Sequence, residues 1–596
     1  MNLPISKFAT GVVALAMIVS SCSSDDDATV TSDAVSSASD TVDDTTTPDP
    51  TTPDPTTPDP TTPDTTTPDT APAETTAAPA DTQPTETASD GGTLVVAISE
   101  DPGQYNPALT TSGSVHTASE LMYNGLVSYD EDFAPQPDLA LSWDVEEDGA
   151  LYRFHLRDDV VWHDGTRFTS ADVKYTFENV LTEFHSRTTA SVGSVLVSID
   201  TPDETTAEFR FSEPYAPLLQ QLDVTEAPIL PAHIFEGSDP QENPANLEPI
   251  GTGPFMFSSR TPDEELVLVK NPDYFKEGLP ILDEVVMRVI PDEGSQVLAL
   301  ESGEVDWLWG VPGPDLERLS SDGNYGTLNT LVNPGGANCI MTIGFNLDRP
   351  ALQDVRVRRA VAHGLDRQAF LDRVEFGQGN VATAPISSGI PTAYSSDLDL
   401  PGFDVDEAAR LLDEAGWVRD GDGIRTAQGV DGVEDGTALT IGVHLFPNFA
   451  PYGELMKAML LEVGVEVEVN ALERATMVEE VFTERNFDTT VISYCNGTDP
   501  EIGIRRMYVS SNIAPIPFSN AAGYVNPEVD ALFDEARQTV DPEARKAIYR
   551  TLQEILVEEL PYLWLVETTS TRIFTSECSG FRAFGHFAEA ASCQRE

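Results

Sequence analysis

Helix and strand patterns alternate along the sequence, and this alternation predicts an α/β fold. The chain has 596 residues, 40% of them apolar, with a mean hydropathy of -0.21. A single hydrophobic core rarely organises more than about 250–300 residues, so a single small domain is excluded. The mean hydropathy also excludes a multi-span membrane protein. The length therefore favours at least two lobes of α/β structure.

Local signals at the ends of elements give the expected order of helices and strands. Residues 91–92 are glycines that precede a short apolar strand over residues 94–98. Thr169 and Asp172 match a capping box, which opens a helix through residue 181. Asp354, Asp366, Asp406 and Asp541, the last followed by a proline at the permitted first position, predict four further helix starts, and Gly464 ends another helix. These expected elements are helices over 355–363, 366–374, 406–415, 455–463 and 542–560 and a strand over 465–469.

The N-terminus has the pattern of an export signal followed by a lipidation site. One cation, Lys7, precedes an apolar run over residues 8–19 that is too short to span a bilayer. The run ends Val-Ser-Ser-Cys, which resembles the bacterial lipobox. We expect residues 1–21 to be a signal peptide and Cys22 to carry a lipid anchor on the cell membrane. Cleavage by an ordinary signal peptidase, which leaves a free cysteine, is the alternative.

Residues 22–90 predict a disordered linker behind that anchor. The segment is built from Thr, Pro, Asp, Ala and Ser, and Thr-Thr-Pro-Asp recurs five times between residues 46 and 69. Such a composition cannot bury enough apolar surface to offset the entropy of ordering. Regular prolines and repelling aspartates favour an extended tether. A bare linker and an O-glycosylated stalk both fit the composition.

The charge of the chain excludes one class of partner. The sequence holds 100 acidic and 33 basic residues, a net charge of -67 and a pI near 4.1. A protein this acidic repels a phosphate backbone, so we expect no nucleic-acid partner. The first 90 residues hold 16 of the acids and one base, which leaves a net charge of -52 on the remaining 506 residues. The folded part therefore has an acidic, solvent-facing shell.

Four cysteines besides Cys22 are expected to form two disulfides. An even number of cysteines in an exported chain favours disulfides over free thiols. Four cysteines allow three pairings, and we favour the one that closes a short C-terminal loop and joins two strand-like segments. A metal site is the competing use, but no Cys-x-x-Cys or nearby histidine supports it. The favoured pairs are Cys339 with Cys495 and Cys578 with Cys593.

Common catalytic motifs are missing from the sequence. None of the lysines is followed by Ser or Thr, so there is no P-loop. There is also no G-x-S-x-G elbow and no H-E-x-x-H pair, which removes the commonest hydrolase and metalloprotease interpretations. We expect no enzymatic activity, no cofactor and no metal.

Ordered motifs recur across residues 92–575. The run from Asn124 through Val173 contains Gly125–Asp130, Pro137–Trp143, Trp162–Gly165 and Phe168–Val173, and five further motifs follow it: Gly251–Phe255, Asn271–Phe275, Asp354–Ala360, Ala409–Trp417 and Leu560–Tyr562. Together they resemble the extracellular solute-binding proteins of family 5, the dipeptide, oligopeptide and nickel type that serves ABC importers. Six blocks in the expected order make the resemblance specific.

The resemblance implies a fold and a function. The implied fold is α/β. It is a two-lobe periplasmic-binding-protein-like (type II, cluster C) fold with an extra subdomain in the N-terminal lobe. Lobe I is expected at about 91–338 plus 560–596, with the inserted subdomain near 138–248, and lobe II at about 340–558. The lobes would close on a peptide-like or other small solute, which a monomer would deliver to an ABC permease. A surface receptor or sensor on the same fold and, less favoured, a secreted hydrolase are the alternatives.

The resemblance also implies candidate ligand-binding residues. In peptide-binding relatives an aspartate holds the ammonium group of the ligand, and Asn496 stands at the matching position in Tyr494–Pro500. An amide is neutral, so Asp499 could substitute, or the solute could lack a free amine; capping of the next helix is the other role for Asp499. Aromatic residues could stack on the solute or pack in the core, and an arginine could hold a carboxylate. The further candidates are Tyr105, Asn106, Trp309, Tyr494 and Arg506.

Overall fold

The computed structural model describes residues 91–596 except 131–132, 331, 334–336, 584 and 595–596. The expected signal peptide, the lipidation site Cys22 and the expected linker lie outside the described residues. No helix in the described part of the chain is both long and apolar enough to cross a membrane.

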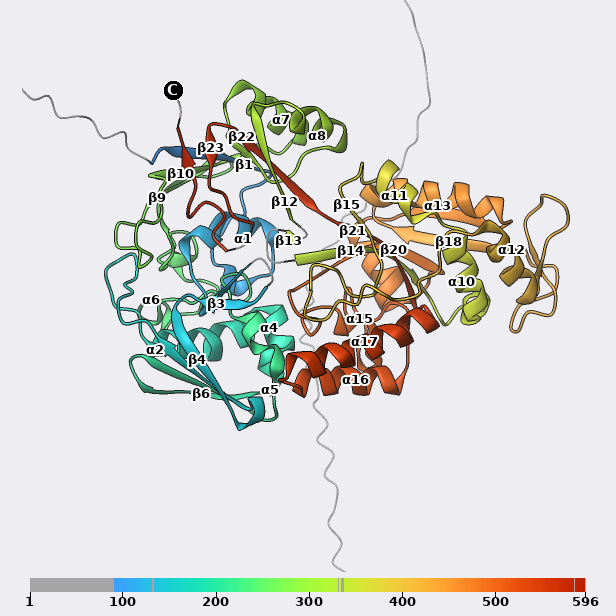
Figure 1. The fold of residues 1–596 in the computed structure, drawn as a ribbon, viewed down its shortest axis with the longest axis horizontal. Coiled ribbons are helices and arrows are strands. Elements are labelled where there is room, and N and C mark those ends of the chain that lie inside the picture. The colour runs from blue at the N-terminus through green and yellow to red at the C-terminus, as the bar shows by residue number, and fades with distance from the viewer. Residues whose placement is uncertain (1–90, 131–132, 331, 334–336, 584, 595–596) are drawn as a thin grey trace, which may run out of the picture. The chain divides into compact units, whose positions relative to one another are not determined.

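The first sheet has seven strands and places β1 at its centre (Figure 1). β1 runs parallel to β10 and β11, and the other neighbours are antiparallel. The apolar run of β1 is buried on both faces, as expected for a central parallel strand. In spatial order the strands are β12 (Tyr325–Thr330), β22 (Ser570–Thr575), β11 (Trp307–Leu308), β1 (Thr93–Ile98), β10 (Glu284–Val289), β9 (Glu265–Lys270) and β8 (Phe255–Thr261).

A second mixed sheet is built from residues 332–568. β14 pairs antiparallel with β20 and β21, whereas β18 runs parallel to β19 and β20. The strands are β15 (Gly379–Val381), β21 (Tyr562–Thr568), β14 (Ala337–Phe345), β20 (Thr489–Asn496), β18 (Thr440–Leu445) and β19 (Glu466–Ala471), with β13 (Val332–Asn333) on β14.

Smaller sheets complete the strand content of the described residues. The four-stranded sheet has the order β4 (Ala140–Glu146), β5 (Leu151–Leu156), β7 (Thr206–Phe211) and β6 (Leu196–Asp203). The two-stranded pairs are β2 (Val127–Tyr129) with β3 (Pro135–Pro137), β16 (Trp417–Val418) with β17 (Thr426–Ala427), and β23 (Cys578–Ser579) with β24 (Ser592–Cys593).

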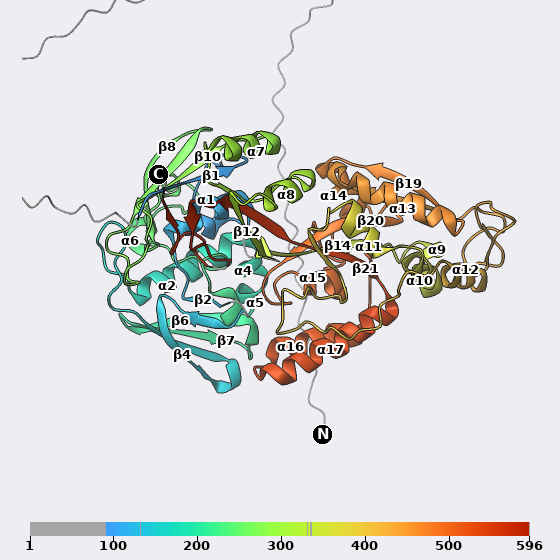
Figure 2. The ribbon, with the colours of Figure 1, turned by 45° about the horizontal axis from the view of Figure 1, so that its top comes forward.

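Helices flank these sheets, and α16 runs side by side with α17, the longest helix of the described residues (Figures 1 and 2). Those before the second sheet are α1 (Gly113–Ser119), α2 (Ser170–Thr176), α3 (Thr182–Phe184), α4 (Ser186–Ala190), α5 (Val192–Val195), α6 (Ala232–Phe235), α7 (Glu293–Ser302) and α8 (Gly313–Ser320). Those that follow are α9 (Pro350–Gln353), α10 (Val355–His363), α11 (Arg367–Arg373), α12 (Val405–Glu414), α13 (Ala450–Glu462), α14 (Arg474–Val478), α15 (Arg505–Tyr508), α16 (Pro527–Gln538) and α17 (Pro542–Glu559).

Separate hydrophobic cores underlie the two large sheets. One core gathers the second sheet and its helices, and another gathers the first sheet with the four-stranded sheet. The chain passes from the second sheet to the first at Thr569, between β21 and β22. The expected return to lobe I at about residue 560 falls before β21, whose apolar side chains are buried in the core of the second sheet.

Most of the expected helix starts match the structure. Asp354, Asp366 and Asp541 each cap the helix that follows, through a side-chain oxygen that accepts from a backbone N–H. The helix expected from residue 406 begins earlier, because Asp404 accepts a hydrogen bond from Glu407 N at 2.9 Å. The helix expected from residue 455 begins at residue 450, since a proline is tolerated in its first turn.

The two disulfides have the favoured pairing. Cys339 is bonded to Cys495, its register partner across β14 and β20. Cys578 is bonded to Cys593 and closes the C-terminal loop, in which β23 pairs with β24. The Cys339–Cys495 bridge joins two central strands of the second sheet. The Cys578–Cys593 bridge closes a loop that packs on the first sheet.

Candidate functional site

A cavity of ≈ 580 Å³ lies where the first sheet, the second sheet and the crossing segment meet. Its volume falls within the range of about 300–1,000 Å³ that small-molecule sites occupy. The first sheet contributes the end of β1, the residues after β11 and Thr571 of β22, and the crossing segment contributes Thr569. The lining residues are Ala97, Ile98, Ser99, Glu100, Gly113, Ser114, Thr117, Glu293, Gln296, Trp309, Gly310, Val311, Gln378, Thr569 and Thr571.

The sheet topology explains why these residues converge. β1 and β11 are parallel, so their carboxyl ends lie at the same edge of the sheet. Ser99 and Glu100 follow β1 directly, and Trp309 follows β11. Open α/β sheets bind ligands outside the carboxyl ends of their strands, and the cavity occupies that place.

Two glutamines brace the cavity from different sides. Gln296 of α7 donates from Nε2 to Ile290 O at 2.7 Å, which holds its amide against the end of β10. Gln378, which precedes β15 of the second sheet, donates to Val311 O at 3.4 Å. The second hydrogen bond joins the two sheet systems directly at the edge of the cavity.

Trp309 forms the aromatic wall of the cavity. Its ring lies 5.5 Å from that of Trp307 and 4.7 Å from that of Phe587, both edge-to-face. The Arg572 guanidinium lies 5.0 Å from its centroid, within cation–π range. Burial lowers the pKa of Arg572 to about 10. Phe587 belongs to the loop closed by the C-terminal disulfide, so that loop positions the wall.

Tyr105 and Asn106 lie away from this cavity and have structural contacts. The Tyr105 hydroxyl donates to Asp101 at 3.2 Å, and the Arg260 guanidinium lies 5.6 Å from its ring. Burial raises the pKa of Tyr105 to about 12. Asn106 donates to Asn246 at 2.9 Å and accepts from Ala108 N at 3.0 Å, as the cap of a short helix. We therefore do not carry these two residues into the site.

Tyr494, Asn496 and Arg506 lie together in the second sheet system, outside the lining of the cavity. Tyr494 is 1% exposed and packs edge-to-face on Tyr562. Arg506 donates from Nε to Gly503 O at 3.1 Å, and burial lowers its pKa. In the described part of the chain, the buried Asn496 Oδ1 accepts no hydrogen bond. Gly503 has a φ of +108°, and a Cβ there would come within 2.5 Å of that oxygen.

Asp499 is held in a buried ion pair. Its two carboxylate oxygens accept from Arg545 Nη1 and Nη2 at 2.5 and 2.9 Å, and Oδ1 also accepts from Glu501 N at 2.9 Å. Burial alone would lower the pKa of Arg545, but the Asp499 carboxylate outweighs it and raises that pKa. With both oxygens engaged, Asp499 stabilises the loop before α15 and does not offer its charge to a solute.

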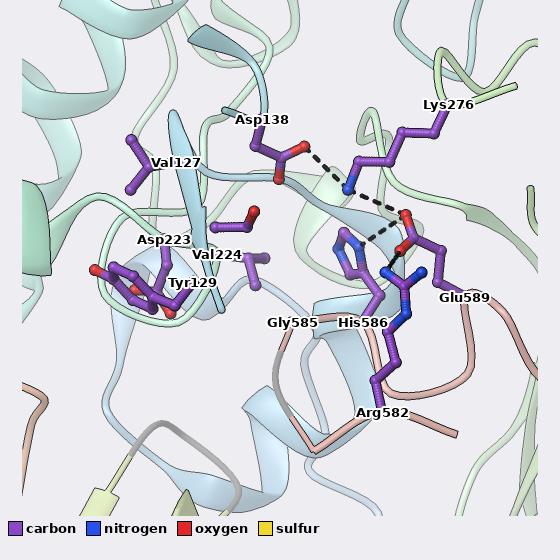
Figure 3. Close-up of a pocket in the computed structure, with 11 residues that line it drawn as sticks. Val127, Tyr129, Asp138, Asp223, Val224, Lys276, Arg582, Gly585, His586 and Glu589 are labelled. Atoms are coloured by element: carbon purple, nitrogen blue, oxygen red, sulfur yellow. Dashed lines mark hydrogen bonds and ion pairs between the residues drawn. The ribbon is translucent and has the colours of Figure 1, made fainter. Parts of the chain in front are cut away.

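A second, smaller cavity of ≈ 60 Å³ lies beneath the C-terminal loop (Figure 3). Lys276 Nζ sits between Asp138 at 3.3 Å and Glu589 at 3.1 Å. Arg582 also pairs with Glu589, at 2.9 Å, while His586 contacts the Tyr123 carbonyl oxygen at 2.7 Å. A volume this small holds one or two water molecules, so we assign it a structural role.

Asp223 lines the smaller cavity on the side opposite Lys276 (Figure 3). Its Oδ1 accepts from Glu226 N at 3.2 Å. Burial and the neighbouring Glu226 carboxylate raise the pKa of Asp223 to about 7. Asp223 is therefore protonated for part of the neutral pH range.

Of the expected ligand-binding residues, only Trp309 lines the large cavity. Glu100, Gln296 and Thr571 were not singled out from the sequence, although each lines it. One signal in the sequence could have identified Glu100: it follows the first apolar strand, and α/β sheets bind ligands beyond the carboxyl ends of their strands. Thr571 gave no such signal, because its position depends on β22 crossing between β11 and β12.

Comparison with known proteins assigns the family. The model of the bacterial extracellular solute-binding proteins, family 5, matches residues 134–515. The chain belongs to that family. A peptide-binding protein of Brucella ovis, described as a putative ABC transporter component, is 28% identical over 479 residues, which cover 78% of this chain and 85% of that protein.

Solved structures share the two-lobe fold. The oligopeptide-binding protein AppA of Bacillus subtilis, in complex with a nonapeptide, has a TM-score of 0.67 at 25% identity and covers 85% of this chain and 99% of its own. NikA from Brucella suis, in complex with Fe(III)-EDTA, has a TM-score of 0.71 at 25% identity, with 84% and 97% covered. The two-lobe α/β fold inferred from the sequence motifs is thereby confirmed.

Proposed function

We propose that this protein captures a small solute outside the cytoplasm and delivers it to an ABC import permease. Its two lobes would be the first sheet with the four-stranded sheet, and the second sheet with its helices. The ≈ 580 Å³ cavity at their junction carries the proposal, because residues of both sheet systems and of the crossing segment line it. Closure of two lobes on a solute is a hinge motion, in which a few connecting residues absorb the change.

Contacts far from the crossing segment support a closing motion. Thr498 of the second sheet system donates to the Gln220 carbonyl oxygen at 3.0 Å. Arg537 of α16 pairs with Glu213, which follows the four-stranded sheet, at 2.7 Å. These polar contacts are few and exposed in part, so separating them on opening requires little free energy.

Family membership supports transport but leaves the solute open. The relatives compared above were solved with a nonapeptide and with Fe(III)-EDTA, two chemically different compounds. Among the described residues no group of three or more His, Cys, Asp or Glu side chains is arranged to hold a metal ion. We propose a peptide-like or other organic solute and no catalytic step of the protein's own.

The N-terminal sequence supports a membrane-anchored location. We propose that export removes residues 1–21, that a lipid on Cys22 holds the protein at the outer side of the cell membrane, and that residues 22–90 tether the lobes to it. In Cys22→Ala, fractionation should find the protein in the soluble extracytoplasmic fraction or the medium. Continued membrane association of that variant would contradict the lipid anchor.

Solute capture can be tested on the purified protein by two measurements. Native mass spectrometry should show a bound small molecule that is released on unfolding, because a closed cleft retains its solute. Small-angle X-ray scattering should then show a smaller radius of gyration with the molecule than after its removal. A protein that carries no molecule, and whose radius never changes with any solute in a nutrient extract, would contradict capture by closure.

A further inference from the structure

The lining of the large cavity carries one sign of charge. Glu100 and Glu293 are its charged residues, and no Lys, Arg or His side chain lines it. Within the described residues neither carboxylate has an ion-pair partner or a hydrogen-bond donor. In the smaller cavity, by contrast, Asp138 and Glu589 are both paired with Lys276.

Two almost fully buried side chains add acceptors without partners to the same lining. Gln296 is 8% exposed, and its Nε2 is committed to Ile290 O, yet no described group donates to its Oε1. Thr571 is 5% exposed, and its hydroxyl makes no hydrogen bond with a described residue. Both residues line the cavity, so each oxygen can accept a hydrogen bond from a donor bound there.

We propose that the cavity binds a solute that carries positive charge, as an ammonium or guanidinium group. Its N–H donors would be received by the carboxylates of Glu100 and Glu293 and by the oxygens of Gln296 and Thr571, while an apolar or planar part would lie against Trp309. The proposal rests on the proposed function, since it names the class of solute for the same cavity.

Electrostatics separates the charge classes. A cation in a partly desolvated cavity with two carboxylates gains charge-assisted hydrogen bonds, which are about twice as strong as neutral ones. An anion there would meet two like charges with no basic lining side chain to compensate them. The net charge of -67 also concentrates cations near the entrance. Arg572 stands behind Trp309 and outside the lining, so it does not reverse this preference.

A competition experiment with a defined mixture tests the charge class. The purified protein, stripped of bound molecules by partial unfolding and refolded, is incubated at pH 7 with casein hydrolysate, spermidine, arginine and citrate. Molecules retained after ultrafiltration are identified by mass spectrometry and sorted by charge. We expect the retained fraction to be enriched at least tenfold in cationic over anionic species, and the enrichment to fall in 0.5 M salt because charges are screened.

Matched variants assign the enrichment to the cavity. In Glu100→Gln/Glu293→Gln, retention of the cationic species should fall at least tenfold. Both side chains are exposed and unpaired, so the melting temperature should stay unchanged. Glu264→Gln removes the same charge from an exposed site outside the cavity and should retain the wild-type preference. Thr571→Val should weaken retention less than the double variant does.

The outcomes separate this inference from the proposed function. Retention of anionic or neutral species in preference to cationic ones overturns the charge class while leaving solute capture intact. Retention that the double variant and Glu264→Gln lower equally would also overturn it, because the effect would then be due to net charge. Retention of nothing by the wild type counts against both the charge class and solute capture.

Discussion

Carboxylates line both cavities compared above, but only the smaller cavity contains a cation, Lys276, that pairs with two of them. Beneath the C-terminal loop, Lys276 lies within 3.3 Å of Asp138 and Glu589, and the volume is ≈ 60 Å³. At the crossing segment, Glu100 and Glu293 face ≈ 580 Å³ without a basic neighbour in the lining. Paired charges in a small space hold a fold together, whereas unpaired charges around a large space are left for a ligand. Four variants test that contrast.

Lys276→Met should give the largest loss of stability. The substitution leaves the carboxylates of Asp138 and Glu589, which are 4% and 2% exposed, without their shared cation. Breaking a buried ion pair from one side costs about 3–5 kcal/mol, so we expect a loss of that size in the free energy of unfolding. Denaturant titration measures it. Lys457→Met, at an exposed position in α13, is the control, and an equal loss in both variants would contradict a structural role for the small cavity.

Removal of the C-terminal disulfide should have the next largest effect. Cys578 and Cys593 are 15 residues apart, and closing a loop of that length is worth about 3 kcal/mol. The loop carries Phe587 to Trp309 and Glu589 to Lys276, so both cavities depend on it. In Cys578→Ala/Cys593→Ala, calorimetry should find a lower melting temperature and weaker solute binding together. Weaker stability with unchanged binding would show that the loop does not position Trp309.

Asp223→Asn should change how stability depends on pH. The pKa of Asp223 is about 7 in the folded protein, above its ordinary value of 3.8. The folded state therefore keeps a proton that the unfolded state has lost, and wild-type stability falls as pH rises from about 4 to 7. The asparagine variant should lack that fall and be more stable than the wild type at pH 8. Thermal melts at pH 5 and 8 measure the difference.

The control for this pH effect is Asp158→Asn, since Asp158 is exposed and its side chain makes no hydrogen bond with a described residue. Its melting temperature should follow the wild type at both pH values. If Asp223→Asn also followed the wild type, Asp223 would be ionised in the folded protein at neutral pH.

Trp309→Ala should give the smallest effect, on binding more than on stability. The ring lines the large cavity, and aromatic contacts are worth about 0.5–1.5 kcal/mol beyond the area they bury. We expect about fivefold to tenfold weaker binding of the co-purified solute by isothermal titration. Trp309→Phe keeps an aromatic face and should lose less. If the two variants lost equal affinity for the solute, an aromatic face alone would not account for the contribution of Trp309 to binding.

The fold was more predictable from the sequence than the site. Several features could be predicted because each depends on neighbouring residues or on spacing along the chain. They are the helix caps at Asp354 and Asp541, the strand at residues 94–98 and the favoured cysteine pairs. The candidate ligand residues were transferred by motif position. A motif places a residue along the chain but not its partners, so it could not show that Arg545 already holds Asp499.

By itself, the sequence determined the α/β class, the family motifs and the acidic shell, and it favoured the cysteine pairing that the structure shows. Only the tertiary structure decided that Glu100, Gln296 and Thr571 face one cavity while Tyr105 and Tyr494 are packed away from it. The reason is physical: helix and strand periodicity is set within a few residues, but exposure to a cavity depends on segments hundreds of residues apart. β22, at the far end of the chain, comes to lie beside β11 and brings Thr571 to that wall.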